Sequence, residues 1–152
     1  KYEQLAEKIW EYEESLYNSE MNNWMDVREG KQKIDDIGAM AWCHGAPGIL
    51  YSRLKCYKYV KDQKWKERLG KDVCRAYKKL KEYWRRDSWC LCHGICGNLW
   101  ILEKASEFLE DKKEIFNYYP AKEDVYLLPQ EKENPGLMNG YGGILLYLIQ
   151  KQ

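Results

Sequence analysis

The sequence lacks the features of several large functional classes. Its charges nearly cancel, with 25 Lys and Arg against 24 Asp and Glu and a formal net charge of +1. This balance argues against a nucleic-acid-binding protein, which needs a basic face. No apolar stretch approaches the roughly 20 residues of a membrane-spanning helix. The first residues, KYEQLAEKIW, are charged and helix-patterned, so they do not resemble a secretion signal.

Histidine is scarce, and both copies lie in the same short motif. Residues 43–48 read CHGAPG and residues 92–97 read CHGICG, and these contain the only two histidines of the 152 residues. Four of the six cysteines lie in or beside these stretches, whereas a disulfide scaffold spreads its cysteines through a shorter, loop-rich chain. The clustering predicts metal binding in a reducing, cytoplasmic compartment. Cys56 and Cys74 lie in apolar helical patterns and are predicted to be buried thiols.

Three Gly-x-x-Gly elements divide the chain into similar units. They occupy residues 45–48, 94–97 and 140–143, and their first glycines are 49 and 46 residues apart. A near-constant period of this size indicates repeated supersecondary units. Each element precedes an apolar run with helical spacing, which predicts three inner helices that start at glycine turns.

More polar amphipathic segments lie before these turns. Residues 2–17 and 66–84 each combine one apolar stripe with a charged face, as expected of outer helices. A third outer helix is weaker, because residues 120–129 include two prolines. We expect no strand, although residues 125–128, VYLL, are ambiguous. The sequence therefore predicts an all-α domain that repeats an outer helix, a loop, a glycine turn and an inner helix.

The paired motifs favour a zinc site. Cys43 and Cys92 hold equivalent places at the starts of two helices, and equivalent places of stacked repeats face each other. His93 can turn into the same site, which yields three protein ligands and one open position, the pattern of a catalytic zinc. The positive ends of the two helices would favour thiolate over thiol. His44 follows a cysteine that already points at the metal, so we expect it to be a second-shell group or a proton donor rather than a ligand.

Two other interpretations of the motifs stay open. The glycines could serve helix packing alone, with the cysteines as buried apolar thiols. Alternatively, Cys90, Cys92, His93 and Cys96 could form a closed structural metal site. The turn from residue 93 into a helix limits how many of these side chains can converge, so we expect Cys90 and Cys96 to be bystanders.

Several motifs together resemble the lanthionine synthetase C-like cyclases. The resemblance rests on AWCHGAPGI at 41–49, LCHGICGN at 91–98 and NPGLMNGYGGI at 134–144, and it extends to residues 12–28. It covers nearly the whole chain and is especially close to the cyclase domain of bifunctional class II lanthionine synthetases. Residues 1–152 would then form the C-terminal part of that domain, with about three of its seven repeats.

The resemblance implies a fold, a cofactor and a reaction. The family fold is an α/α toroid, and the zinc ligands of the family fall on Cys43, Cys92 and His93. Zinc would activate a cysteine of a precursor peptide, whose thiolate adds to a dehydrated Ser or Thr and closes a lanthionine or methyllanthionine ring. An acid must protonate the resulting enolate, and His44 is a candidate by position. The implied partners are the precursor peptide and the rest of the cyclase domain or a dehydratase domain of the same protein.

The chain also departs from the family pattern. The upstream motifs that carry further catalytic Asp and His residues have no counterpart, and Asp35 and Asp36 do not match them. Three repeats of a ring would leave two open apolar edges, so we expect a fragment whose activity alone is doubtful. The alternatives are a zinc-containing or glutathione-binding relative without cyclase activity, and a metal-free helical-repeat binding module. A glycoside-processing α/α barrel would need paired carboxylates in its cleft, and the glycine turns contain none.

Overall fold

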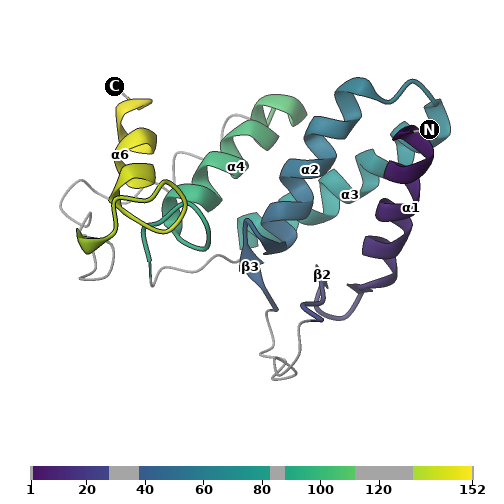
Figure 1. Cartoon of the computed structure of the whole chain (residues 1–152). Coiled ribbons are helices and arrows are strands. Elements are labelled where there is room, and N and C mark those ends of the chain that lie inside the picture. Colours follow the sequence, from purple (N-terminus) through teal and green to yellow (C-terminus); the bar gives the residue numbers. More distant parts are fainter. Residues whose placement is uncertain (1, 28–37, 83–87, 112–131, 152) are drawn as a thin grey trace.

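The chain folds mainly into helices. A computed structural model describes residues 2–27, 38–82, 88–111 and 132–151, and the elements below lie in these ranges (Figure 1). The helices are α1 (Tyr2–Ser15), α2 (Ala46–Tyr59), α3 (Gln63–Glu82), α4 (Ile95–Leu109) and α6 (Tyr141–Ile149). They match the two predicted outer helices and the three predicted inner helices. None of the described helices has both the length and the apolar character needed to cross a membrane.

Two short hairpins correct the expectation that no strand is present. β1 (Tyr17–Asn18) pairs antiparallel with β2 (Asn23–Trp24), with Tyr17 opposite Trp24. β3 (Met40–Ala41) pairs antiparallel with β4 (His44–Gly45), with Met40 opposite Gly45. Strands of two residues cannot display the alternation of side chains that reveals a strand in sequence. The second hairpin includes the start of the first Cys-His-Gly motif and so orients it.

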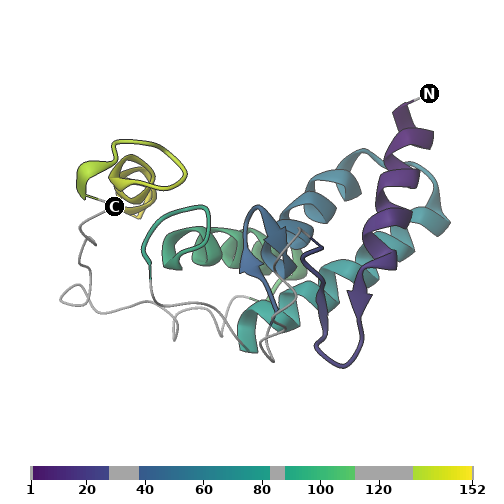
Figure 2. The same cartoon turned by 60° about the horizontal axis from the view of Figure 1, so that its bottom comes forward.

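The three inner helices follow one another across the molecule. α6, α4 and α2 form a curved row, with α1 at the opposite end from α6, and both views agree on this order (Figures 1 and 2). α3 packs along α2 and also contacts α4. The described residues form an open row and not a closed toroid. The predicted helix near 120–129 and the run 125–128 lie outside the described residues.

Two apolar clusters join the inner helices. The larger joins α2, α3 and α4 through buried residues that include Leu50, Val73 and Leu102. The smaller joins α4 and α6, and includes Leu99 and Ile144 together with residues of the loop before α4. Because both clusters include α4, they fix the spacing of the three glycine turns that begin the inner helices.

A buried charged group attaches α1 to this core. Asp72 on α3 is fully buried, and its Oδ2 accepts hydrogen bonds from Trp10 Nε1 at 2.7 Å and from Arg53 Nε at 3.0 Å. Arg75 also pairs with Asp72 and joins it to Glu14, at 2.9 Å. Buried charges of this kind are tolerated when they are paired and hydrogen-bonded. The contacts hold the end of α1, and therefore the hairpin that follows it, beside α2.

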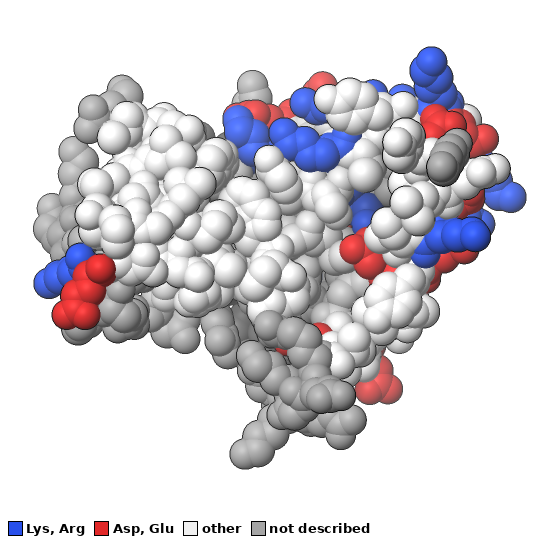
Figure 3. Space-filling model, viewed as in Figure 1, with Lys and Arg blue, Asp and Glu red and all other residues white. Residues whose placement is uncertain are grey.

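Apolar side chains are exposed at both ends of the row. The exposed face of α1 carries Tyr2, Leu5, Ile9 and Tyr12, which recur at helical spacing. At the other end, Leu145, Leu146 and Ile149 of α6 are exposed. The side of the molecule over α4 and α6 is largely free of charge in Figure 3, whereas charged side chains gather toward α1. These exposed faces agree with the two apolar edges that the sequence predicts for an incomplete ring.

Candidate functional site

The backbone places the two Cys-His-Gly motifs side by side. Trp42 N donates a hydrogen bond to Cys92 O at 2.6 Å, and Cys92 N donates to Met138 O at 2.8 Å. Met138 holds the place, two residues before the first glycine, that Cys43 and Cys92 hold in the other motifs. The three loops are therefore joined in one row at the same end of the inner helices. Only the first two loops carry cysteine there.

The same glycine turn leads into each inner helix. The helix caps are Gly45, Gly94 and Gly140, and none is assisted by a side-chain cap. The second glycine of each motif packs against the carbonyl oxygen six residues earlier. A Cβ atom at Gly97 would lie 1.8 Å from Leu91 O, and one at Gly48 would lie 2.1 Å from Trp42 O. Glycine is required at these positions because the backbone of the loop occupies the space of a side chain.

The first turn differs from the other two in one buried hydrogen bond. In the second motif, Ile95 N donates directly to the backbone carbonyl of Ser88 at 2.9 Å. In the first motif, the side chain of Asn23 completes the turn: Oδ1 accepts from Ala46 N at 2.8 Å, and Nδ2 donates to Ala39 O at 3.0 Å. Asn23 is 1% exposed. This amide attaches the β1–β2 hairpin to the first Cys-His-Gly motif.

The turns bring the two predicted cysteine ligands together. Cys92 Sγ donates to Cys43 Sγ at 3.4 Å. Two sulfurs that each lie about 2.3 Å from one zinc ion can be at most about 4.6 Å apart, so this pair fits two positions of a zinc site. Both side chains are reachable from solvent, because Cys43 is exposed and Cys92 is half-buried.

The third predicted ligand does not join the pair. His93 is exposed, and no group of three His, Cys, Asp or Glu side chains within the described residues is close enough to hold a metal. His93 follows Cys92 directly in the sequence, but its side chain is exposed. The structure thus assembles the two thiols of the predicted triad and leaves the imidazole outside them.

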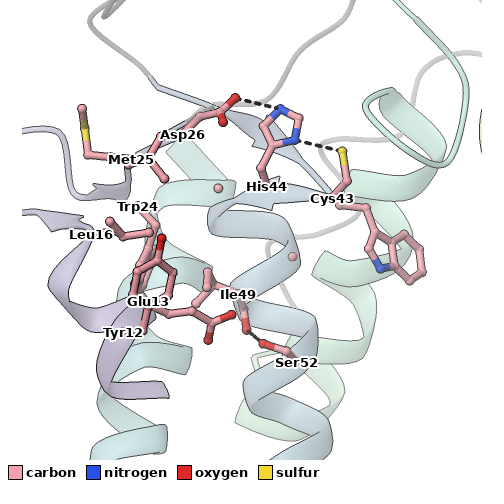
Figure 4. A pocket seen from close by; sticks show the side chains of 14 residues that line it. Tyr12, Glu13, Leu16, Trp24, Met25, Asp26, Cys43, His44, Ile49 and Ser52 are labelled. Atoms are coloured by element: carbon pink, nitrogen blue, oxygen red, sulfur yellow. Dashed lines mark hydrogen bonds and ion pairs between the residues drawn. The ribbon is translucent and has the colours of Figure 1, made fainter. Parts of the chain in front are cut away.

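His44 lies between a thiol and a carboxylate. Its Nδ1 lies 2.9 Å from Cys43 Sγ, and its Nε2 lies 3.7 Å from Asp26 Oδ2 (Figure 4). The side chains of His44 and Asp26 are 26% and 14% exposed. His44 therefore contacts a predicted ligand through one ring nitrogen and a carboxylate through the other.

The Cys92 thiol holds its proton more firmly than expected from the sequence. Burial raises the pKa of Cys92 to about 11, and the hydrogen bond and charge of Cys43 and the charge of Cys90 add to the effect. This increase runs against the thiolate preference expected from the helix N-termini, because desolvation favours the neutral thiol. A bound divalent cation would favour the thiolate of Cys92 over the thiol, since a coordinating thiol is deprotonated.

A cleft of about 410 Å³ opens beside the first motif. Its walls come from α1, the β1–β2 segment, the first motif and α2, and side chains from all four converge on it in Figure 4. The walls are mainly apolar, and the polar groups include Glu13, Asp26, Cys43, His44 and Ser52. The cleft is large enough for a side chain of a bound peptide, and it reaches both Cys43 and His44.

The remaining cysteines follow the predictions in part. Cys90 and Cys96 are buried, and Cys56 is half-buried. Cys74 is exposed, so its predicted burial is wrong. It precedes Arg75 on the part of α3 that faces away from the apolar cluster, where a single small apolar residue does not reveal its orientation. All six cysteines are free thiols.

Two residues of the site were missed by the sequence analysis. Asn23 and Asp26 belong to the loop of residues 17–30, which the sequence marks only as long and aromatic. Neither lies within or next to a Cys-His-Gly motif, so the motif pattern does not point to them. The only signal was the resemblance of residues 12–28 to the corresponding family segment.

Comparison with known proteins identifies the family. The family model described as lanthionine synthetase C-like protein matches residues 1–152, and the chain belongs to this family. The chain is also 32% identical over 174 aligned residues to the lacticin 481/lactococcin biosynthesis protein LcnDR2 of Lactococcus lactis subsp. lactis. That alignment covers 99% of the chain and 18% of LcnDR2. The chain thus spans about a fifth of the length of this relative.

Proposed function

We propose that this chain supplies part of the active site of a zinc-dependent cyclase. The cyclase forms lanthionine or methyllanthionine rings by adding a cysteine thiolate of a precursor peptide to a dehydrated Ser or Thr. The observation that carries the proposal is the 3.4 Å approach of Cys43 Sγ and Cys92 Sγ, from motifs 49 residues apart. Membership of the family and similarity to a relative named for lacticin 481/lactococcin biosynthesis support the same reaction.

Cys43, Cys92 and His93 are the residues that would hold zinc. Zinc would lower the pKa of the peptide thiol and keep it as the reactive thiolate. The chain has to orient two sulfurs, which the joined loops do, and to bring in His93. Reduced thiols are required throughout, which fits a cytoplasmic enzyme.

His44 is placed to handle a proton beside the reacting groups. Addition of the thiolate to the dehydrated residue forms a carbon–sulfur bond and leaves an enolate, which takes up one proton. His44 would deliver that proton through Nδ1, the ring nitrogen that lies next to Cys43 Sγ. The cleft along α1 and the β1–β2 segment would hold peptide residues next to the ring being formed.

The rest of the site would come from outside these residues. The exposed apolar faces of α1 and α6 would be covered by further repeats, which would complete an α/α toroid. Those repeats, a dehydratase domain of the same protein and the precursor peptide are the proposed partners.

Metal content tests the proposal directly. Native mass spectrometry of the purified, reduced chain should detect one bound zinc that a chelator removes, and Cys92→Ala should lose it. Cys74→Ala is the matched control, because it removes an exposed thiol on α3 and should retain the metal. A folded wild-type chain without zinc, or a Cys92→Ala chain that keeps it, would contradict the metal role.

The exposed position of His93 favours one alternative, a relative that binds peptides without zinc. Incubation of a dehydrated precursor peptide with a complete synthetase that contains this chain distinguishes cyclisation from peptide binding alone. Cyclisation removes free thiols from the peptide, which alkylation followed by mass spectrometry counts. Peptide binding without loss of thiols, in a metal-free protein, would support the binding module instead.

A further inference from the structure

We infer that Asp26 is the positioning residue that aims the His44 imidazole at Cys43. The inference rests on the proposed function for its consequence in catalysis, and on geometry alone for the positioning itself. Asp26 lies in the segment that follows β2, while His44 lies in β4, so the contact joins two hairpins that are distant in sequence.

The geometry separates the two edges of the imidazole ring. Asp26 Oδ2 lies 3.7 Å from Nε2, and Cys43 Sγ lies 2.9 Å from Nδ1. At 3.7 Å the Asp26–His44 contact is an ion pair when the imidazole is protonated, and the attraction of the carboxylate for Nε2 turns the opposite nitrogen, Nδ1, toward Cys43. Figure 4 shows the three side chains in this order, with His44 between Asp26 and Cys43.

The segment that carries Asp26 is itself firmly attached. Asn23, three residues earlier, donates to Ala39 O and accepts from Ala46 N, at either end of the first turn. Trp24 is 2% exposed and packs in the larger core cluster. The carboxylate is therefore presented from a backbone that is tied to the same turn as His44. A positioning contact requires this kind of common support.

Both side chains also face the cleft. Asp26, Cys43 and His44 all line it, so a peptide bound there would meet the imidazole at the edge that points to Cys43. His93 has the same neighbours in sequence, Cys on one side and Gly on the other, but it is exposed. Among the described contacts, a carboxylate partner is therefore found for the histidine of the first motif and not for that of the second.

Ring dynamics test the positioning without any metal or activity. The chain contains only two histidines, so ¹³C labelling of histidine yields two sets of ring signals, which His44→Gln assigns. Relaxation of the metal-free, reduced wild type should show a rigid His44 ring and a mobile His93 ring. In Asp26→Asn, and more fully in Asp26→Ser, the His44 ring should become as mobile as that of His93.

Glu107→Gln is the control, because it removes an exposed carboxylate near the end of α4 that pairs only with the neighbouring Lys104 among the described contacts. It should leave both rings unchanged. A wild-type His44 ring as mobile as that of His93, or a ring that stays rigid in both Asp26 variants, would overturn the inference. Measuring two variants keeps the test decisive if one of them is poorly folded.

Kinetics of a complete synthetase containing this chain test the consequence. Asp26→Asn should lower kcat for cyclisation by about 10- to 100-fold, part of the roughly 100- to 10,000-fold that a positioned general acid contributes, with KM changed less than about twofold. An unchanged kcat together with a mobile ring would overturn the role in catalysis. Failure of the zinc measurement on Cys92→Ala would instead contradict the proposed function and leave the ring measurement as it stands.

Discussion

The two Cys-His-Gly motifs share a sequence and a turn, but their histidines have different surroundings. His44 is half-buried and contacts Cys43 and Asp26, whereas His93 is exposed. The backbone is less different, because both second glycines pack against a carbonyl oxygen six residues earlier. The motif thus determines the turn and the place of the cysteine. Neighbouring segments determine what the histidine contacts, and the β1–β2 segment lies against the first motif.

The strongest test concerns the glycines that the two motifs have in common. Gly97→Ala and Gly48→Ala should each lower the free energy of unfolding by about 3 kcal/mol, because the new Cβ would meet backbone oxygen. The new Cβ atom would lie 1.8 Å from that oxygen at Gly97 and 2.1 Å from it at Gly48. Urea denaturation followed by circular dichroism measures both. Gly70→Ala is the control: its Cβ would lie 3.7 Å from Tyr57, and it should raise the stability by up to about 1 kcal/mol. If only one of the two positions tolerated alanine, the two motifs would not share the same glycine-dependent turn.

The amide of Asn23 provides the next largest difference. Asn23→Ala leaves Ala46 N and Ala39 O without their buried partner, which should lower the free energy of unfolding by about 2 kcal/mol. Ser88→Ala is the counterpart at the second motif. It keeps the backbone carbonyl that accepts from Ile95 N and loses only side-chain contacts, so its cost should be about 1 kcal/mol or less. Equal losses would mean that the first turn does not depend on the hairpin.

Substitution of the two histidines should produce a smaller difference in the free energy of unfolding. In the metal-free chain, His44→Gln should lower the free energy of unfolding by about 1 kcal/mol, since it disturbs contacts with Cys43 and Asp26. His93→Gln should change it by less than about 0.5 kcal/mol, as is usual for an exposed side chain. Thermal and urea unfolding of both variants, with zinc removed, measures the difference. A reversed order would show that His93 makes the more important contact.

The pH dependence of the second motif should show the smallest effect. The pKa of Cys92 is raised to about 11 in the folded chain, from 9.0, so the folded state keeps this proton longer than the unfolded state. The associated stability is fully present below pH 9 and is lost as the pH rises toward 11. Urea unfolding of the metal-free chain across this window should therefore show a decline that is shallower in Cys92→Ala. A parallel decline in both would assign the effect to other groups.

Much of the fold follows from patterns in the sequence. The glycine elements at a near-constant spacing predict the starts of α2, α4 and α6, and amphipathic stripes predict α1 and α3. The equivalent places of Cys43 and Cys92 predict that their thiols meet. The two-residue strands escape prediction because they are too short for a period, and the exposure of Cys74 because one small residue does not define a helix face.

The sequence by itself determined the repeated turn, the family and the pair of thiols, because local backbone requirements and the repeat period are written in consecutive residues. Only the tertiary structure decided which histidine is held in place, why Cys92 keeps its proton, and which residues complete the first turn. The surroundings of His44 and the first turn depend on Asp26 and Asn23, which come into place when α1 and the following hairpin lie beside α2. The burial of Cys92 depends on the joined loops of the three motifs. No spacing in the sequence records that approach, in which Asp72 of α3 accepts hydrogen bonds from Trp10 of α1 and Arg53 of α2.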